Sequence, residues 1–292
     1  YLNYEGMDGI IYMLPGDSKV GMKVSNQEYY QTKDSNIVIN GSIASNEMIS
    51  SKDIIYGRYP ENDNEIVIDK MVYDKTKGLE MIGYYEVERM VNSRVFANKE
   101  YIIVGIVDMG SPSIYASRNE LYNIIINGKA GYDYDYGFGV SSVAISEELD
   151  NSSIYSYDSY RDKIVITKGR EPSNDYEVII NESYQEEYKL NKEIDKKVNG
   201  KKLVVVGYYK SEDDINSYFV SSNTKKYDLI ENSKGIIIYS KDKDKVINNF
   251  KDIGVKVIDV YQSDRNNYID SMKDSVNASL IVASIMLGIS LI

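Results

Sequence analysis

The sequence predicts an α+β fold in which small mixed sheets pack with helices and a long helix ends the chain. Two observations predict it. Short runs of aliphatic, often β-branched residues, typical of buried strands, alternate with segments whose apolar residues recur every three or four positions. One strand-bearing segment also occurs twice, which indicates a repeated unit rather than one continuous sheet.

Composition excludes several classes of function. With 45 acidic and 34 basic residues the net charge is −11, so we expect no nucleic-acid partner. The chain has no His and no Cys, which removes thiol and imidazole catalysis, disulfides and the usual zinc ligand sets. The phosphate-loop pattern GxxxxGK[ST] does not occur, so any ATP hydrolysis belongs to another chain. We expect no catalytic residue, cofactor or metal; a hydrolytic carboxylate pair is a third possibility, but spacing singles out no pair.

A 13-residue segment occurs twice. Residues 57–69, GRYPENDNEIVID, return as residues 169–181, GREPSNDYEVIIN, with Gly, Arg, Pro, Asn, Asp and Glu in register. A second landmark follows each copy, YIIVGIV at 101–107 and LVVVGYY at 203–209. The first landmark repeats after 112 residues and the second after 102, which predicts a net insertion of ten residues in the first copy, within 78–98. This spacing indicates an old duplication rather than a solenoid array.

The repeated segment predicts a turn that leads into a buried strand. Gly permits a positive φ, Pro fixes φ, and Asn or Asp side chains bond to nearby backbone. Asp69 and Asn181 then stand where a helix N-cap belongs, so each copy should run turn, strand, helix and second strand. The Arg and Glu of each copy form either an ion pair that stabilises the turn or part of a ligand site. The turn residues are Gly57, Arg58, Pro60, Glu65, Gly169, Arg170, Pro172 and Glu177, and the strand residues expected to be buried are Ile66, Ile68, Val178 and Ile180.

Aromatic and acidic residues alternate in one segment between the two copies. Residues 132–139 read YDYDYGFG. Aromatic faces and carboxylates both attract cations, so this segment is a candidate loop for a sugar or a cationic peptide. The alternative is a hairpin or linker loop with no ligand. The candidate ligand residues are Tyr132, Asp133, Tyr134, Asp135 and Tyr136.

The C-terminal part predicts a strand-helix-strand unit followed by a long helix. Apolar runs at 235–240 and 255–260 flank a segment, 241–253, whose apolar residues share one helical face. A second amphipathic pattern, around Ile269 and Met272, leads into residues 278–292, which carry no charge. A full membrane span needs about 20 apolar residues. The tail is therefore either the start of a transmembrane helix or a buried terminal helix, and we expect one continuous helix that enters a bilayer.

Taken in order, these segments resemble the extracytoplasmic domain of FtsX-like and MacB-type ABC transporter permeases. The resemblance rests on GRYPENDNEIVIDKMVYDK, the later YIIVGIVD, the strand-helix-strand of 235–260 and the ending LGISLI, and it covers roughly residues 53–292. It implies a MacB-like α+β periplasmic core, with a porter-like subdomain and small inserted α/β subdomains, that continues into transmembrane helices. The second copy of the repeat departs from the short MacB-type domain and points to a larger variant found in Gram-positive permeases.

The repeat and the resemblance together divide the chain into six expected parts. These are an N-terminal segment of the porter-like body (1–52), the first repeat unit (53–130), a linker or loop region (131–160), the second repeat unit (161–232), a β-α-β unit of the porter-like body (233–264), and a stalk helix that begins a transmembrane helix (265–292).

The resemblance implies a membrane protein whose domain lies on the extracytoplasmic side of the cell membrane of a Gram-positive bacterium. Such a domain couples helix motion, driven by a cytoplasmic ABC ATPase bound to the membrane part, to an external substrate or partner. Export, antimicrobial-peptide resistance and lipid or lipoprotein handling are the implied roles, with a permease dimer and a peptide or lipid substrate as implied partners. The alternative is a membrane-anchored extracellular binding or adhesion protein with no transport role.

Overall fold

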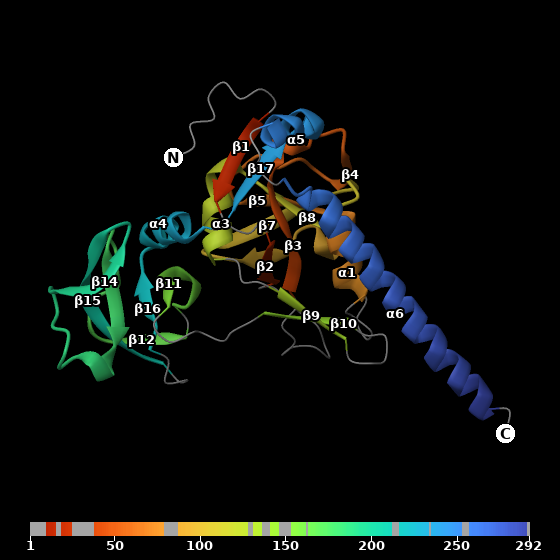
Figure 1. Ribbon diagram of the computed structural model, residues 1–292. Helices are drawn as coiled ribbons and strands as arrows, with labels where there is room; N and C mark the ends of the chain where they lie inside the picture. Colours follow the sequence, from red (N-terminus) through yellow and green to blue (C-terminus); the bar gives the residue numbers. More distant parts are fainter. Residues whose placement is uncertain are drawn as a thin grey trace.

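The computed structural model has mixed α/β content with small sheets and few helices (Figure 1). Two larger sheets carry the two copies of the repeated segment, and the last helix, α6 (Val260–Ser290), extends away from them. The structure describes residues 10–15, 19–24, 38–78, 87–127, 131–135, 141–145, 153–161, 163–211, 216–233, 235–252 and 257–290.

The first unit is a sheet with its connecting helices. Its strands are β2 (Lys19–Val24), β3 (Val38–Ser45), β4 (Ile54–Gly57), β5 (Glu65–Asp69), β6 (Arg94–Phe96), β7 (Glu100–Val107) and β8 (Ser113–Ala116). Its helices are η1 (Asn46–Met48), α1 (Lys70–Gly78), α2 (Val87–Met90), η2 (Arg118–Glu120) and α3 (Leu121–Asn127). The strand order is β4-β7-β5-β8-β3-β2-β6. Because β6 pairs with β7 as well as β2, six of these strands close into a ring of pairings around a buried aliphatic core.

The second unit is an open sheet. Its strands are β11 (Ile154–Ser156), β12 (Ile164–Gly169), β13 (Glu177–Asn181), β14 (Glu193–Val198), β15 (Lys201–Ser211) and β16 (Tyr218–Val220). Its helices are η3 (Tyr157–Ser159), η4 (Glu182–Tyr184) and α4 (Ser222–Asn232). The strand order is β11-β16-β13-β15-β12, with β14 paired to β15. Two smaller hydrophobic clusters lie on its opposite faces.

The two sheets share strand order and strand direction. The series β4-β7-β5-β8-β3 corresponds to β12-β15-β13-β16-β11, and in both the successive pairs are antiparallel, parallel, antiparallel and parallel. The parallel pair at the centre is irregular at equivalent points, after Ile66 in β5 and after Val178 in β13. The positions predicted to be buried, Ile66, Ile68, Val178 and Ile180, are all buried. The sequence repeat therefore coincides with a repeated strand topology.

The two units differ in the segment that follows the first central strand, β5 in the first unit and β13 in the second. The first unit has the nine-residue helix α1 there, whereas the second has only the three-residue η4, so the helix predicted after Asn181 is reduced to one 3-10 turn. Asn92 and Asn191 both have positive φ and occupy equivalent places. The backbone N–H of each donates a 2.7 Å hydrogen bond to the next central strand, at the carbonyl of Ile103 in β7 or of Val205 in β15. From Asp69 to Asn92 is 23 positions, but from Asn181 to Asn191 is only 10. The insertion in the first unit therefore lies before Asn92. The second unit has a slightly longer segment between Asn191 and β15, which reduces the net difference in length between the two units.

A small two-stranded sheet joins segments that are far apart in the sequence. β1 (Ile10–Pro15) pairs antiparallel with β17 (Ile236–Ser240), and α5 (Lys243–Asp252) follows with Val246 and Phe250 buried. The strand predicted at 255–260 is wrong in its described part: residues 257–259 have no regular structure, and α6 begins at Val260. The Asp259 side chain accepts a 2.9 Å hydrogen bond from the backbone N–H of Gln262, so it caps the start of the helix.

The last helix is continuous over 31 residues, from Val260 to Ser290. Beyond its first turns, Met272, Val276 and Leu280 are between 43% and 60% exposed, so the described part of the protein does not cover this apolar side. Within the ranges described here, no helix has both the length and the apolar character of a membrane span. Entry of the chain into a bilayer stays a prediction.

Candidate functional site

The first turn contains a bidentate ion pair. Arg58 donates from both terminal nitrogens to the two carboxylate oxygens of Glu65, at 2.7 and 2.6 Å. The backbone N–H of Glu61 and the side-chain amide of Asn62 donate to the same carboxylate at 2.8 and 3.1 Å. The hydrogen bond from Arg58 lowers the pKa of Glu65 to about 2.

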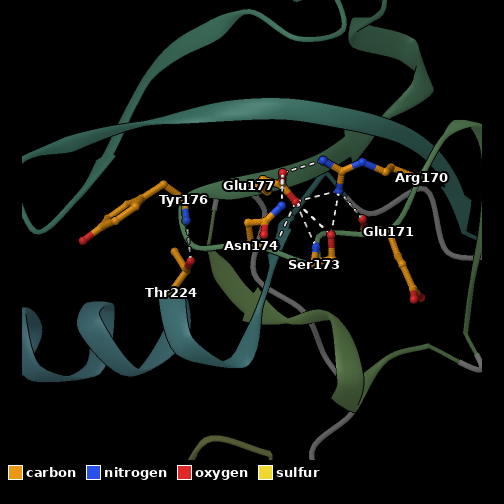
Figure 2. A network of polar contacts seen from close by, with 7 residues as sticks. All are labelled: Arg170, Glu171, Ser173, Asn174, Tyr176, Glu177 and Thr224. Carbon is orange, nitrogen blue, oxygen red and sulfur yellow. Dashed lines mark hydrogen bonds and ion pairs between the residues drawn. The ribbon is translucent and has the colours of Figure 1, made fainter.

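The second turn repeats this arrangement (Figure 2). Arg170 donates to Glu177 at 2.6 and 2.5 Å, and the backbone N–H groups of Ser173 and Asn174 each donate to it at 2.9 Å. The hydrogen bond from Arg170 holds the pKa of Glu177 well below its usual range. In both turns the contacts of the carboxylate are made within its own turn. They fit an ion pair that stabilises the turn, while a ligand role stays a prediction.

Steric limits explain why each turn has a glycine. Gly57 and Gly169 have φ values of 80° and 85°, in the left-handed region that side chains disfavour. A Cβ at either glycine would stand 2.3 Å from a carbonyl oxygen, that of Val104 or Val206. The N–H of the following arginine donates to that same carbonyl, at 2.9 Å in the first turn and 3.0 Å in the second. The close approach that permits this hydrogen bond leaves no room for a side chain.

Part of the candidate ligand segment lies in a described strand. Residues 131–135 form the backbone of β9 (Gly131–Asp135), which pairs antiparallel with β10 (Ser141–Ile145). The side chains of Tyr132, Asp133, Tyr134 and Asp135 lie outside what the structure describes, as does Tyr136. The proposed binding role of this segment stays a prediction.

A buried carboxylate at the end of β5 accepts hydrogen bonds from α1 and from the segment that follows β7. Asp69 is fully buried, and its oxygens accept 2.8 Å hydrogen bonds from the backbone N–H groups of Met71, in α1, and Met109, after β7. Burial raises the pKa of Asp69 to about 6, and the charge of Asp108 adds to the rise. The sequence identified Asp69 as a cap, but no local pattern indicated its second bond, to a residue 40 positions away.

Five residues at the ends of β5 and β7 and in α1 form what we call the first strand-end surface: Asp69, Lys70, Asp74, Asp108 and Met109. The start of α6 comes near the end of this surface at Gly110. Arg265 Nε lies 3.5 Å from the place that a side-chain carbon on Gly110 would occupy. Burial raises the pKa of Tyr268, and the charges of Asp74 and Asp69 add to that rise. Sequence reasoning missed both Arg265 and Tyr268.

The equivalent surface of the second unit is hollow and open. Asn181 takes the place of Asp69, and its side-chain oxygen accepts a 3.0 Å hydrogen bond from the N–H of Ser183. Beside it is a cavity of about 400 Å³ at the ends of β13 and β15. Glu182 and Lys210 form a 2.8 Å ion pair in its wall. The lining residues, which we call the second strand-end surface, are Asn181, Glu182, Ser183, Gln185, Glu186, Lys210 and Ser211.

Three comparisons with known proteins add little to this geometry. No protein-family model and no curated protein matches the chain. Among solved structures, the extracellular domain of the noncanonic ABC-type transporter YknZ from Gram-positive bacteria is similar at 19% sequence identity and a TM-score of 0.26, over 49% of this chain and 69% of that one. A TM-score of 0.26 lies below the level at which two folds are called the same.

Proposed function

We propose that this chain is the extracytoplasmic domain of an ABC transporter permease, in the larger form found in Gram-positive bacteria. It would couple motion of transmembrane helices, driven by a separate cytoplasmic ATPase, to a peptide or lipid substrate or an external partner. Export, antimicrobial-peptide resistance and lipid or lipoprotein handling are the roles that such coupling serves. The repeat units would be small α/β subdomains of one body, and the shared order of their strands supports an old duplication.

The observation that carries this proposal is the helix α6. Asp259, which caps α6, forms a 3.1 Å ion pair with Lys243 of α5, and Arg265 Nε lies 3.5 Å from the place that a side-chain carbon on Gly110 would occupy. The same helix continues without interruption to Ser290, through a segment with no charged residue after Asp274. A helix that is fixed at one end and apolar at the other can transmit displacement between the body and a membrane.

A proline in the exposed middle of α6 tests the coupling. Lys273→Pro removes a backbone hydrogen bond and kinks the helix, at a local cost of about 3 kcal/mol or more. We expect the body to remain folded, since its sheets do not depend on that turn. In the full-length protein with its ATPase, the variant should reach the cell surface and fail to support transport or resistance, while Lys273→Ala should behave as the parent protein does.

Two outcomes would count against the proposal. Normal transport by correctly folded Lys273→Pro would show that α6 does not couple the body to the membrane. Full capture of an external ligand by a protein that has no further membrane helices and binds no ATPase would favour the membrane-anchored binding protein instead, since an anchor tolerates a kink.

A further inference from the structure

The chain contains three Asn-Gly pairs, and the fold places them in different surroundings. They are Asn40-Gly41, Asn127-Gly128 and Asn199-Gly200. An asparagine followed by glycine loses its side-chain amide readily, because glycine has no side chain to hinder attack by its own nitrogen on the amide carbon. The attack also requires that the asparagine side chain can rotate and that the backbone around it can move. These two requirements separate the three pairs.

Asn199 and Gly200 are the two residues of a tight hairpin turn between β14 and β15. Val198 pairs with Lys201 on either side of them, and both turn residues have positive φ, 51° and 74°, as a type I′ turn requires. Both are exposed, and a Cβ on Gly200 would meet nothing within 4 Å beyond its chain neighbours. Within the described ranges, the side chain of Asn199 has no hydrogen-bond partner. Its amide can therefore rotate toward the Gly200 nitrogen.

The other two asparagines are fixed by the fold. Asn40 lies inside β3, which pairs with β2 and with β8. Asn127 is buried, and its side-chain oxygen accepts a 2.6 Å hydrogen bond from Ser159 Oγ. The side-chain nitrogen of Asn127 donates a 2.7 Å hydrogen bond to the carbonyl of Asn123. Neither pair can reach the geometry of attack without breaking strand pairing or these hydrogen bonds.

A carboxylate of α4 lies beside the Asn199 turn. Glu231 accepts a 2.6 Å hydrogen bond from the backbone N–H of Asn199, and this bond joins the tip of the hairpin to the helix. A second negative charge at position 199 would repel this carboxylate. An isoaspartate at position 199 would also add a carbon to the main chain of a two-residue turn, whose two φ angles are already restricted.

We propose that Asn199 is a site of spontaneous deamidation, and that the carboxylate formed there releases the hairpin tip from Glu231 of α4. The Gly200 nitrogen attacks Cγ of Asn199, a Cγ–N bond forms, the Cγ–Nδ2 bond breaks, and ammonia leaves with the proton of Gly200 N–H. Water then opens the succinimide ring at either of its two carbonyl–nitrogen bonds and gives aspartate or isoaspartate. Water is the only co-reactant, and nothing is oxidised or reduced. This inference is independent of the proposed transport role.

Ageing of the full 292-residue chain tests the reaction. The protein is kept at pH 8 and 37 °C, either folded or unfolded in urea, and peptide mapping by mass spectrometry follows aspartate and isoaspartate at Asn40, Asn127 and Asn199. In urea the three pairs should react at similar rates, because only the local sequence then matters. In the folded chain Asn199 should react at least tenfold faster than the other two. Asn199→Gln keeps an amide on a longer side chain and should give no product at that position over the same time.

Variants test the release of the hairpin tip. Asn199→Asp carries the charge of the product, and we expect the backbone amide of residue 199 to lose at least tenfold of its protection from hydrogen exchange. Glu231→Gln keeps an acceptor but removes the negative charge, so adding Asn199→Asp to that variant should leave the protection unchanged. Both positions are exposed, and amide spectra verify that the variants fold.

Three results would overturn the proposal. Equal rates at all three asparagines of the folded chain would show that the hairpin turn does not favour the reaction. Aspartate without isoaspartate at residue 199 would contradict the succinimide route. Equal loss of amide protection by Asn199→Asp with and without Glu231→Gln would show that repulsion from Glu231 does not release the tip.

Discussion

The first and second units have the same central strands but different surroundings. In both, alternate residues of the central strand separate into two cores: Ile66 and Ile68 pack on one face and Val67 on the other, as Val178 and Ile180 oppose Ile179. The first unit adds β2 and β6, which close its strands into a ring, and Arg265 of α6 lies near Gly110, which follows β7. The second remains an open sheet with a hollow at the same place. The shared part follows from short-range sequence, and the different part depends on segments contributed from elsewhere in the chain.

Substitution of the turn glycines should have the largest effect on stability. Gly57→Ala and Gly169→Ala each place a carbon 2.3 Å from a carbonyl oxygen at a positive φ, and we expect each to lower the free energy of unfolding by about 3 kcal/mol or more. Urea unfolding measures the loss. Amide hydrogen exchange should show that Gly169→Ala lowers the protection of amides in the second unit, while the amides of the first unit stay protected.

Gly200 supplies the control for this comparison. It also has a positive φ, 74°, but nothing lies within 4 Å of the carbon that alanine would add. Gly200→Ala should therefore cost only backbone strain, about 1 kcal/mol. If all three substitutions lower the free energy of unfolding equally, the nearby carbonyl oxygens of Val104 and Val206 are not the reason that the turns require glycine.

The buried carboxylate should give the first unit a pH dependence that the second lacks. Because folding raises the pKa of Asp69 from 3.8 to about 6, its contribution to stability is full below pH 4 and is lost as the pH rises through 6. A shift of about two units corresponds to a loss of about 1 to 3 kcal/mol. Asn181, at the equivalent place, does not titrate.

Unfolding between pH 4 and pH 7 measures this loss. In Asp69→Asn the decrease in stability over that range should disappear, whatever the absolute stability of the variant. A decrease of unchanged size in Asp69→Asn would assign the pH dependence to another group.

The turn ion pairs should have the smallest effect. Arg58→Ala should lower the free energy of unfolding by about 1 kcal/mol, since the guanidinium is half-exposed and solvent screens the pair. Arg170→Ala should act in the same direction on the second unit. Because folding lowers the pKa of Glu65 to about 2, the effect of Arg58→Ala should be full above pH 4.5 and shrink as the pH falls toward 2.

Arg94→Ala is the matched control, since Arg94 and its partner Glu100 are both exposed. Its effect should be smaller than that of Arg58→Ala in the same urea titration. A larger effect of Arg94→Ala would contradict the idea that burial of Glu65 makes the Arg58–Glu65 pair more stabilising than an exposed pair.

Much of the repeated fold could be predicted because its determinants are local. The turn residues, the aliphatic triplets and the caps at Asp69 and Asn181 lie within 13 consecutive positions, and the structure places the triplets in buried strands. The ring closure could not be predicted, because β2 and β6 are short and pair with strands far along the chain. The expected strand at 255–260 was wrong because alternation alone does not exclude a helix capped by Asp259.

The strand-end surfaces were missed for a different reason. Arg265 belongs to a polar stretch with no motif, and its nearness to Gly110 arises only from the tertiary placement of α6. Lys210 and Glu186 likewise come together only when η4 follows β13 at the end of β15. Such surfaces are products of tertiary packing, which a linear pattern does not encode.

Distance measurements between spin labels test most directly whether α6 is fixed to the first unit. The chain has no cysteine, so Ile55→Cys and Asn277→Cys, both at exposed positions, label β4 and α6 without further changes. We expect one narrow distribution of distances between the two labels, and a broad distribution once Tyr268→Ala removes a partly buried ring of α6. A broad distribution in the parent protein, unchanged by Tyr268→Ala, would show that α6 pivots freely and would contradict its role as a rigid connection.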